Sequence, residues 1–309
     1  MKILITGGAG FQGSHLSEAL LKKGHTITII NTFREEKLKN IESFKNSVNV
    51  VFGSITDPVL VEKTVSGHDV VFHLAANINV DQSLKDPKSF VDVNVVGTFN
   101  ILEAVRANGI RMIHASTCEV YGDGHDLKAN ELLDETAEMK PNSPYAATKA
   151  GADRLCYSYY KSFGVPVTIV RPFNIFGERQ KSGTFGALIP ILVRKAMTGD
   201  TLTVFGDGLA TRDYLHVSDL VRAYELVLET IGLEGKSINF GSGVNTSVND
   251  IATYIAKKFN AEIKHGPARP GEVQRFPADI SYAKSLGFSP KISIYEGIDR
   301  YIDWVKTQS

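Results

Sequence analysis

Residues 1–14 read Met-Lys-Ile-Leu-Ile-Thr-Gly-Gly-Ala-Gly-Phe-Gln-Gly-Ser, and this stretch decides the fold. An apolar run of strand-forming residues leads into glycines spaced three apart, and an amphipathic, helix-like stretch follows. In such a strand, turn and helix, the first glycine allows the turn, the second lets the backbone approach a diphosphate, and the third lets the helix pack closely. The helix N-terminus then attracts the anion. The stretch therefore predicts a dinucleotide site whose contacts are Gly7, Gly10, Phe11, Gln12 and Gly13.

Strand-like and helix-like segments alternate along the chain that follows. Strands are expected at residues 3–5, 26–30, 48–52, 70–74, 112–116 and 167–171, and helices near residues 58–65, 87–108 and 143–163. Parallel strands connected by helices are the natural assembly for this alternation. We therefore expect an α/β fold, a Rossmann-type doubly wound parallel sheet, over residues 1–172. Residues 173–309 are expected to form a smaller, mainly substrate-binding region, with some of its elements returning to the first domain.

Composition narrows the class of protein. The 309 residues are 43% hydrophobic, which is enough for a sizeable core, and 34 basic residues balance 34 acidic ones. A zero net charge predicts neither a nucleic-acid partner nor an anionic membrane surface. The two cysteines, Cys118 and Cys156, have no paired spacing, so neither a disulfide framework nor a metal site is expected. No apolar run approaches the length of a membrane span, and a cytoplasmic enzyme is the expectation.

The end of the second expected strand bears on the choice of cofactor. An acidic residue there binds the ribose hydroxyls of NAD, whereas a basic residue accommodates the 2′-phosphate of NADP. This chain has Asn31 at the position of the acid and Arg34 three residues further on. Because an asparagine can still bond a ribose hydroxyl, NAD is the predicted cofactor, and NADP is the alternative.

Two further segments are candidates for cofactor contacts. His73-Leu-Ala-Ala76 places the small residues Ala75 and Ala76, after Leu74, at a strand end where a cofactor can pass close to the backbone. Asn94 is interpreted either as an ordinary helix residue or as a brace for the catalytic strand. We include Leu74, Ala75, Ala76 and Asn94 among the predicted cofactor contacts.

A tyrosine and a lysine at helical spacing predict the chemistry. Ser143-Pro-Tyr-Ala-Ala-Thr-Lys149 enters a helix, so Tyr145 and Lys149 lie one turn apart on one face. A nearby ammonium, helped by the oxidised nicotinamide, is expected to lower the pKa of the phenol, which makes Tyr145 a usable base for a sugar hydroxyl. Thr117 stands at the end of an expected parallel strand, where open α/β sheets bind ligands. The structural alternative is a tyrosine packed on an amphipathic helix beside a solvated lysine.

At this point the sequence resembles the extended short-chain dehydrogenase/reductase family, the nucleotide-sugar epimerases and dehydratases. The resembling segments are residues 6–13, 73–76, 94–98, 116–122, 145–149, 171–174, 204–208, 212–214 and 269–272, which together extend over nearly the whole chain. The resemblance implies a tightly held nicotinamide cofactor and a nucleoside-diphosphate sugar as substrate. It implies Thr117, Tyr145 and Lys149 as the catalytic set.

The resemblance also implies contacts outside the catalytic set. The substrate contacts are Asn174, Leu188, Val204, Arg212 and Arg269, with Val204 in an expected turn-rich ligand loop over residues 204–213. The cofactor contacts gain Ser54 and Ile55 near the adenine, and Tyr145 and Lys149 serve the cofactor as well. Two positions depart from the family pattern, because Asn31 replaces the usual ribose-binding acid and Ser54 replaces an acid near adenine. Both departures leave the choice between NAD and NADP open.

Cys118 and Glu119 favour one branch of this family. In the 4,6-dehydratases a glutamate at the second of these positions removes the C5 proton, and a neighbouring acid assists departure of the C6 hydroxyl. A free thiol is mostly protonated at neutral pH, so Cys118 can donate a proton without special tuning. A nucleotide-sugar dehydratase, of the 4,6- or 5,6-ene-forming type and acting on a UDP-hexose or UDP-N-acetylhexosamine, is therefore predicted. The structural alternatives are a small buried cysteine and a hydrogen-bonding glutamate.

Other functions remain alternatives at this stage. A UDP-sugar 4-epimerase needs only the tyrosine and would leave Glu119 superfluous. A UDP-glucuronate decarboxylase needs a cation for the C6 carboxylate, and residues 141–144 supply no arginine. A dinucleotide sensor without chemistry is disfavoured by the intact catalytic set. Helices in this family often pair as a four-helix interface, and a homodimer is expected through the segments 87–108 and 143–163.

Overall fold

The structure is a computed structural model that describes residues 1–32, 38–122, 131–181, 187–268 and 275–308. The strands are β1 (Lys2–Thr6), β2 (Thr26–Asn31), β3 (Asn49–Phe52), β4 (Val70–His73), β5 (Arg111–Ala115), β6 (Val167–Pro172), β7 (Asn174–Phe176), β8 (Leu202–Phe205), β9 (Thr211–His216), β10 (Ser237–Phe240), β11 (Asn245–Ser247), β12 (Ile263–Gly266) and β13 (Arg275–Phe276). The helices are α1 (Phe11–Lys22), α2 (Pro58–Val65), α3 (Val80–Lys85), α4 (Pro87–Phe90), α5 (Gly97–Asn108), α6 (Pro144–Phe163), α7 (Leu188–Met197), α8 (Val217–Glu229), α9 (Val248–Phe259), α10 (Ser281–Ser285) and α11 (Ile294–Thr307). A π-helical turn, η4, spans Val91–Val96, and short 3₁₀ turns lie at Lys39–Ile41, Lys45–Ser47 and Cys118–Tyr121.

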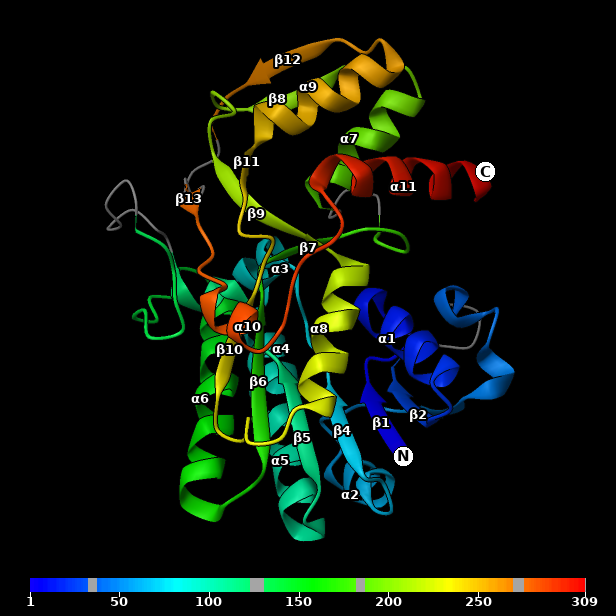
Figure 1. Ribbon diagram of the computed structural model, residues 1–309, viewed down its shortest axis with the longest axis vertical. Helices are drawn as coiled ribbons and strands as arrows, with labels where there is room; N and C mark the ends of the chain where they lie inside the picture. Colours follow the sequence, from blue (N-terminus) through cyan, green and yellow to red (C-terminus); the bar gives the residue numbers. More distant parts are fainter. Residues whose placement is uncertain (33–37, 123–130, 182–186, 269–274, 309) are drawn as a thin grey trace. The chain divides into compact units, whose positions relative to one another are not determined.

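A seven-stranded sheet is built from β1 to β6, the strands of residues 2–172, and from β10 (Figure 1), in the order β10-β6-β5-β4-β1-β2-β3. Neighbouring strands run parallel, with Ile3 beside Ile27 of β2 on one side and Val70 of β4 on the other. The strand order reverses between β1 and β4, and open α/β sheets bind ligands at such a switch point. The expected doubly wound parallel sheet is confirmed.

Helices cover both faces of this sheet. On one face, α2, α5 and α6 enclose a core that contains Val61, Ile101, Val105 and Cys156, all fully buried against the strands. Figure 1 shows α5 and α6 running alongside each other and along β5 and β6. On the other face α8 packs on the sheet, where the ring of Tyr224 meets the edge of Phe72 with centroids 5.9 Å apart. These buried faces hold the carboxyl ends of the strands in place.

The chain divides into two compact units. The first consists of residues 1–120, 141–171 and 221–238, and the second of residues 121–140, 172–220 and 239–309. The second unit has its own core, in which buried residues of α7, α9 and α11 surround β8 and β9. Among the described residues, no helix has both the length and the hydropathy needed to cross a bilayer.

Two sequence expectations are wrong in detail. The helix expected over residues 87–108 is interrupted, because α4 and α5 are joined by the wider π-helical turn η4. Residues 204–213 were expected to form a loop, but they include part of β8 and part of β9, which pair with β12 and with β7, β11 and β13. Pairing partners that lie far away in sequence, rather than local propensity, decide these segments.

Candidate active site

The glycine-rich turn between β1 and α1 leaves no room for side chains. Gly7 has φ of +71°, and its N–H donates to the carbonyl of Ile30 at 2.8 Å. A Cβ on Gly13 would lie 2.2 Å from the carbonyl oxygen of Gly7, and one on Gly7 would lie 3.0 Å from the backbone of Ala75. Helix α1 then begins at Phe11 with no acidic residue in its first turn. This bare helix start fits the diphosphate of a dinucleotide.

Gly13→Ala is expected to weaken this site. The added Cβ would displace the Gly7 carbonyl, so the variant should be destabilised by about 1–3 kcal/mol and lose bound NAD. Thermal melting and the nucleotide content after heat release measure both effects. Gly151→Ala is the matched control, because its Cβ would meet only Val95 at an ordinary 3.8 Å. Equal NAD content in the two variants would show that residue 13 does not shape the site.

The end of β2 and the loop after β3 hold the residues predicted near the adenosine. Asn31 closes β2 and is buried, and its carbonyl accepts the N–H of Gly53 at 3.1 Å. Ser54 Oγ lies 2.7 Å from Thr56 Oγ1, in the turn that leads into α2. Ile55 is buried under α5, where the Asn100 side chain donates to its carbonyl at 2.9 Å. Arg34 lies outside the described residues, and its role stays a prediction.

A buried histidine fixes the loop after β4. The Ala75 N–H donates to Thr6 Oγ1 at 3.1 Å, so the Thr6 hydroxyl proton is directed at Nδ1 of His73, 2.8 Å away. Nε2 of His73 lies 3.0 Å from Thr98 Oγ1, whose own proton goes to the Asn94 carbonyl. This pattern requires a neutral imidazole with its proton on Nε2. Burial, followed by the charge of Lys149, lowers the pKa of His73 to about 3, in agreement with that pattern.

Asn94 braces the same loop from the π-helical turn η4. Its Oδ1 accepts the Asn77 N–H at 2.8 Å, and its Nδ2 donates to the Asn77 carbonyl at 2.9 Å. Nδ2 also donates to Thr148 Oγ1 on α6 at 3.0 Å. All three contacts use side-chain atoms of a residue that is 1% exposed. These contacts brace the loop after β4 against α6, whereas the roles of Asn94 as a brace for the catalytic strand and as a cofactor contact stay predictions.

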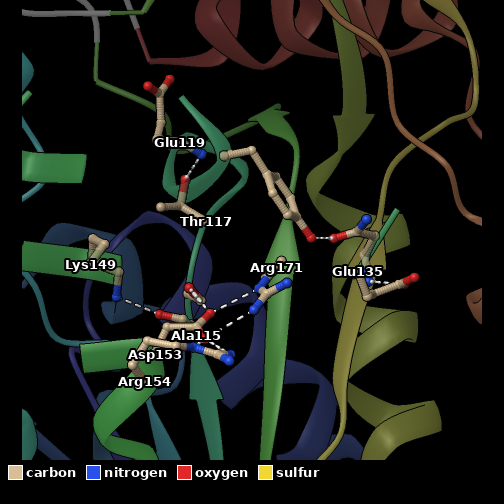
Figure 2. Close-up of polar contacts among 11 residues, drawn as sticks. Ala115, Thr117, Glu119, Glu135, Lys149, Asp153, Arg154 and Arg171 are labelled. Atoms are coloured by element: carbon tan, nitrogen blue, oxygen red, sulfur yellow. Dashed lines mark hydrogen bonds and ion pairs between the residues drawn. The ribbon is translucent and has the colours of Figure 1, made fainter. Parts of the chain in front are cut away.

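Helix α6 brings the predicted catalytic side chains to the end of β5. Ser143 caps the helix by accepting the Ala146 N–H at 3.1 Å, and Pro144 occupies the first turn. Tyr145 is 9% exposed, its phenol lies near enough to Thr117 for that side chain to lower its pKa, and Phe90 meets its ring edge-on. One turn further on, Lys149 Nζ donates to the Ala115 carbonyl at 2.6 Å, as Figure 2 shows. The structure therefore brings Thr117, Tyr145 and Lys149 together.

In the protein alone, burial outweighs the expected lowering of the pKa of the phenol, and the joint effect of Lys149 and bound nicotinamide stays a prediction. Burial raises the pKa of Tyr145 above its ordinary value, and the charges of Glu119 and Cys118 raise it further. The Thr117 side chain acts in the opposite direction and lowers this pKa. Burial also lowers the pKa of Lys149 to about 8. Helical spacing predicted the neighbours correctly but did not reveal that desolvation would dominate their titration.

Cys118 and Glu119 follow Thr117 in the short helical turn Cys118–Tyr121. The Glu119 N–H donates to Thr117 Oγ1 at 3.3 Å, so the turn begins on the catalytic threonine. Cys118 is 3% exposed, whereas Glu119 is partly exposed, and Figure 2 shows its carboxylate extending away from Thr117. Both residues lie near enough to Tyr145 for their charges to act on its pKa. An acid and a thiol thus accompany the phenol.

The predicted substrate contacts lie in the second unit. Asn174 begins β7 and donates to the Asp213 carbonyl at 3.0 Å, and Arg212 of β9 lies over the ring of Phe276 with 5.9 Å to the centroid. Leu188 begins α7 and packs against the core of this unit. Val204 is a correction, because it is fully buried in that core instead of lying in a ligand loop.

Two points qualify the extent of this site. Arg269 lies outside the described residues, so its pairing with Arg212 at a diphosphate stays a prediction. Within the described ranges, no group of three or more His, Cys, Asp or Glu side chains is arranged to hold a metal ion.

The family model for GDP-mannose 4,6 dehydratase matches residues 4–301. The chain belongs to this family. It is 36% identical over 317 residues to the UDP-N-acetyl-alpha-D-glucosaminuronate decarboxylase of Bacillus cytotoxicus, covering 99% of this chain and 98% of that one. It is 34% identical to the dTDP-glucose 4,6-dehydratase of Streptomyces niveus, covering 99% of this chain and 93% of the relative.

A solved structure adds the cofactor to the comparison. The UDP-glucuronic acid 4-epimerase of Bacillus cereus, in complex with UDP-glucuronic acid and NAD, superposes with a TM-score of 0.92 at 33% identity over the whole of both chains. As a member of the GDP-mannose 4,6-dehydratase family with such relatives, the chain is an enzyme, and the predictions of this family and of NAD as its cofactor are confirmed. Dehydratases, epimerases and decarboxylases all occur among the relatives, so family membership alone does not name the reaction.

Sequence reasoning missed several residues that organise this family member's site. His73 stood in a quoted segment without an assigned role, and Asn77, the partner of Asn94, was not singled out. Asp153 follows Lys149 at the same four-residue spacing that separates Lys149 from Tyr145. An acidic residue on the buried face of a helix is a signal that could have been noticed, because such a position requires a partner.

Proposed function

We propose that this chain is an NAD-dependent nucleotide-sugar dehydratase, of the 4,6- or 5,6-ene-forming type, acting on a UDP-hexose or UDP-N-acetylhexosamine. One observation carries the proposal: the Glu119 carboxylate lies two residues after Thr117 and near Tyr145, whose pKa it raises after the larger effect of burial. A carboxylate that lies near the phenol and is partly exposed can act as a base on C5, the carbon next to the one that is oxidised. Plain inversion at C4 has no use for such a base.

The first step is oxidation at C4. When bound, NAD supplies an acceptor for the hydride of C4 and, once reduced, a donor that can return this hydride to C6 or to C4. As its phenolate, Tyr145 takes the proton of the 4-hydroxyl, and the Thr117 hydroxyl bonds the oxygen that becomes the carbonyl. Lys149, bonded to the Ala115 carbonyl, provides the positive charge of the site while it is protonated. These residues produce a 4-keto sugar.

The second step is loss of water. The C4 ketone makes the C5 proton acidic, and the Glu119 carboxylate removes it. The electron pair of the C5–H bond forms the C5–C6 double bond as the C6–O bond breaks. Cys118 gives its proton to the departing hydroxyl, which leaves as water. The thiol is 3% exposed, so this proton is kept from the bulk solvent.

A 4-epimerase is the second candidate. Thr117, Tyr145 and Lys149 are arranged as inversion at C4 requires, and this arrangement does not depend on Glu119. The Bacillus cereus relative, a UDP-glucuronic acid 4-epimerase, supports this alternative. In that reaction Glu119 and Cys118 would only support the turn that begins on Thr117.

Product analysis on a panel of substrates tests the proposal. UDP-, dTDP- and GDP-hexoses and their uronic acids are incubated with the enzyme, and the products are separated and weighed by mass spectrometry. We expect a product that has lost water. An isomer of unchanged mass with inverted C4 would establish the epimerase, and loss of carbon dioxide would establish a decarboxylase like the Bacillus cytotoxicus relative.

We also propose that the enzyme is a homodimer through the outer faces of η4, α5 and α6. Large apolar side chains are exposed there, namely Val91, Phe99, Tyr157 and Phe163. The Arg106 guanidinium lies 5.3 Å from the centroid of the Phe163 ring, so the patch has charged groups at its edge. Exposed apolar patches of this kind commonly mark protein interfaces.

Light scattering tests the homodimer. At micromolar concentration the wild type should have the mass of two chains, and Phe99→Glu should reduce it to one. Phe52→Glu is the matched control, because Phe52 is 47% exposed on β3 and Phe99 is 44% exposed on α5. A monomeric wild type would contradict the proposal.

A further inference from the structure

Three side chains of α6, each one turn after the last, lie at three consecutive residues at the end of β5. Tyr145 lies near enough to Thr117 for that side chain to lower the pKa of its phenol, Lys149 donates to the Ala115 carbonyl, and Asp153 accepts the Ser116 hydroxyl at 2.7 Å. The spacing of four residues places all three on one helix face. The first two belong to the proposed catalytic set. The third, Asp153, has no role in the mechanism above.

Asp153 is completely buried. Its carboxylate has several hydrogen-bond and ion-pair partners, which Figure 2 shows. Its Oδ2 accepts Arg171 Nε at 2.9 Å and its Oδ1 accepts the same guanidinium at 3.1 Å, while Arg154 adds a further contact. Arg171 is 1% exposed and belongs to β6. A buried ion pair contributes little net stability compared with apolar residues of similar volume, so its presence behind the active site calls for another explanation.

We propose that Asp153 is a positioning residue: through Ser116 and Arg171 it fixes the strand end that presents Thr117, and through its negative charge it keeps Lys149 protonated. Only one part of this assignment rests on the proposed function, namely that Thr117 and Lys149 take part in turnover.

The charges around Lys149 support this assignment. His73 of β4 and His114 of β5 face the ammonium from the sheet, and burial is the main cause that lowers the pKa of each imidazole, so both are neutral. Cys156 lies on the same helix, and burial raises the pKa of its thiol. Asp153 differs from these groups. Burial by itself would raise the pKa of Asp153, but the bonds from Arg171 and the charge of Arg154 hold this pKa below the ordinary value.

Desolvation is the effect that Asp153 has to offset. Burial lowers the pKa of Lys149 to about 8, and the neighbouring Cys156 and Asp153 act in the opposite direction. A lysine in this range is close to losing its proton under ordinary conditions. Removing the carboxylate should therefore move the titration of Lys149 to lower pH. A shift of about one unit is expected for loss of an opposite charge one helical turn away.

The titration of Lys149 measures this directly, without any assay of turnover. Protein labelled with ¹³C-lysine is purified with its own nucleotide, and the Cε resonance of Lys149 is identified by its absence from Lys149→Arg. We expect the titration midpoint to fall by about one unit in Asp153→Asn and to keep its wild-type value in Asp153→Glu. Asp153→Asn leaves Arg171 without its anion, so the double variant Asp153→Asn with Arg171→Gln, which removes one charge of each sign, is measured alongside and should move the midpoint less. An unchanged midpoint in Asp153→Asn would overturn the electrostatic half of the proposal.

The pH dependence of turnover separates this proposal from the proposed function. If Lys149 acts as its ammonium, activity is lost as the pH rises through its pKa, so the basic limb of the kcat profile should move to lower pH with the resonance. The titration midpoint of the Lys149 resonance could fall while the basic limb of the kcat profile stays in place. That result would support the electrostatic role of Asp153 and contradict the role of Lys149 in turnover.

Ser116→Ala tests the mechanical half of the proposal. It removes the hydroxyl bonded to Asp153 and keeps the charge of the carboxylate. We expect the Lys149 midpoint to stay unchanged, and kcat to fall about tenfold with KM unaltered, because Thr117 loses part of its support. A kcat equal to that of the wild type would show that Asp153 does not position the strand end.

Discussion

Tyr145→Phe should reduce turnover by about a thousandfold, the largest loss that we expect from any single substitution in this enzyme. The phenol is the proposed acceptor of the 4-hydroxyl proton, and its ring already packs against Phe90, so removal of one oxygen leaves the packing intact. Burial is the main cause that holds the pKa of Tyr145 above its ordinary value in the protein alone, so the positive charges of Lys149 and of bound NAD must lower that pKa to form the phenolate that acts as the base. Turnover of the preferred nucleotide sugar, followed by chromatography of the products, measures the loss.

The control for this substitution is that the variant keeps its fold and its bound NAD. Circular dichroism and the nucleotide released on heating should match the wild type, because neither the fold nor the glycine-rich turn depends on the phenol oxygen. A protein that kept its NAD and also kept its turnover would show that Tyr145 is not the base. A protein that never turned over any sugar, with or without Tyr145, would support the dinucleotide sensor instead.

Glu119→Gln should abolish loss of water while sparing oxidation at C4. The amide cannot remove the C5 proton, so we expect dehydration to fall by about a thousandfold. Oxidation relies on Tyr145 and Thr117, and the Glu119 N–H bond to Thr117 is made by the main chain and survives the change. Reduced nicotinamide should then accumulate after substrate is added, and its absorbance can be followed during a single turnover.

Cys118→Ser is the matched comparison for this prediction. A serine hydroxyl can still pass a proton to the leaving group, so its effect should be much smaller than that of Glu119→Gln. If Glu119→Gln converts substrate at the wild-type rate, the carboxylate is structural and the epimerase becomes the better assignment.

The local pattern of the sequence was sufficient for most of the sheet. The runs of β2, β4 and β6 are rich in apolar and β-branched residues and almost wholly buried, and their predicted positions agree with the structure to within a residue or two. The helix over residues 87–108 and the loop over residues 204–213 were predicted wrongly. In the first case the wide turn η4 carries Asn94 to its bonds with Asn77, and in the second distant strands pair with β8 and β9.

The site could be predicted as a set of neighbours but not as an electrostatic environment. Spacing places Tyr145 and Lys149 on one helix face, and the position of Thr117 at a strand end brings it to them. Spacing contains no information on burial, and burial is what raises the pKa of Tyr145 and lowers that of Lys149. The buried bonds of His73 and Asp153 are likewise visible only once β4, β5, β6 and α6 are assembled.

The central claim is that a carboxylate removes a proton from C5 of a sugar whose C4 has been oxidised. The mass and deuterium content of the product formed by the wild type in deuterated water test this claim most directly. We expect a product that has lost water, carrying solvent deuterium at C5 when the hydride returns to C6. An isomer of the substrate with inverted C4 and no deuterium on its carbon atoms would contradict the account.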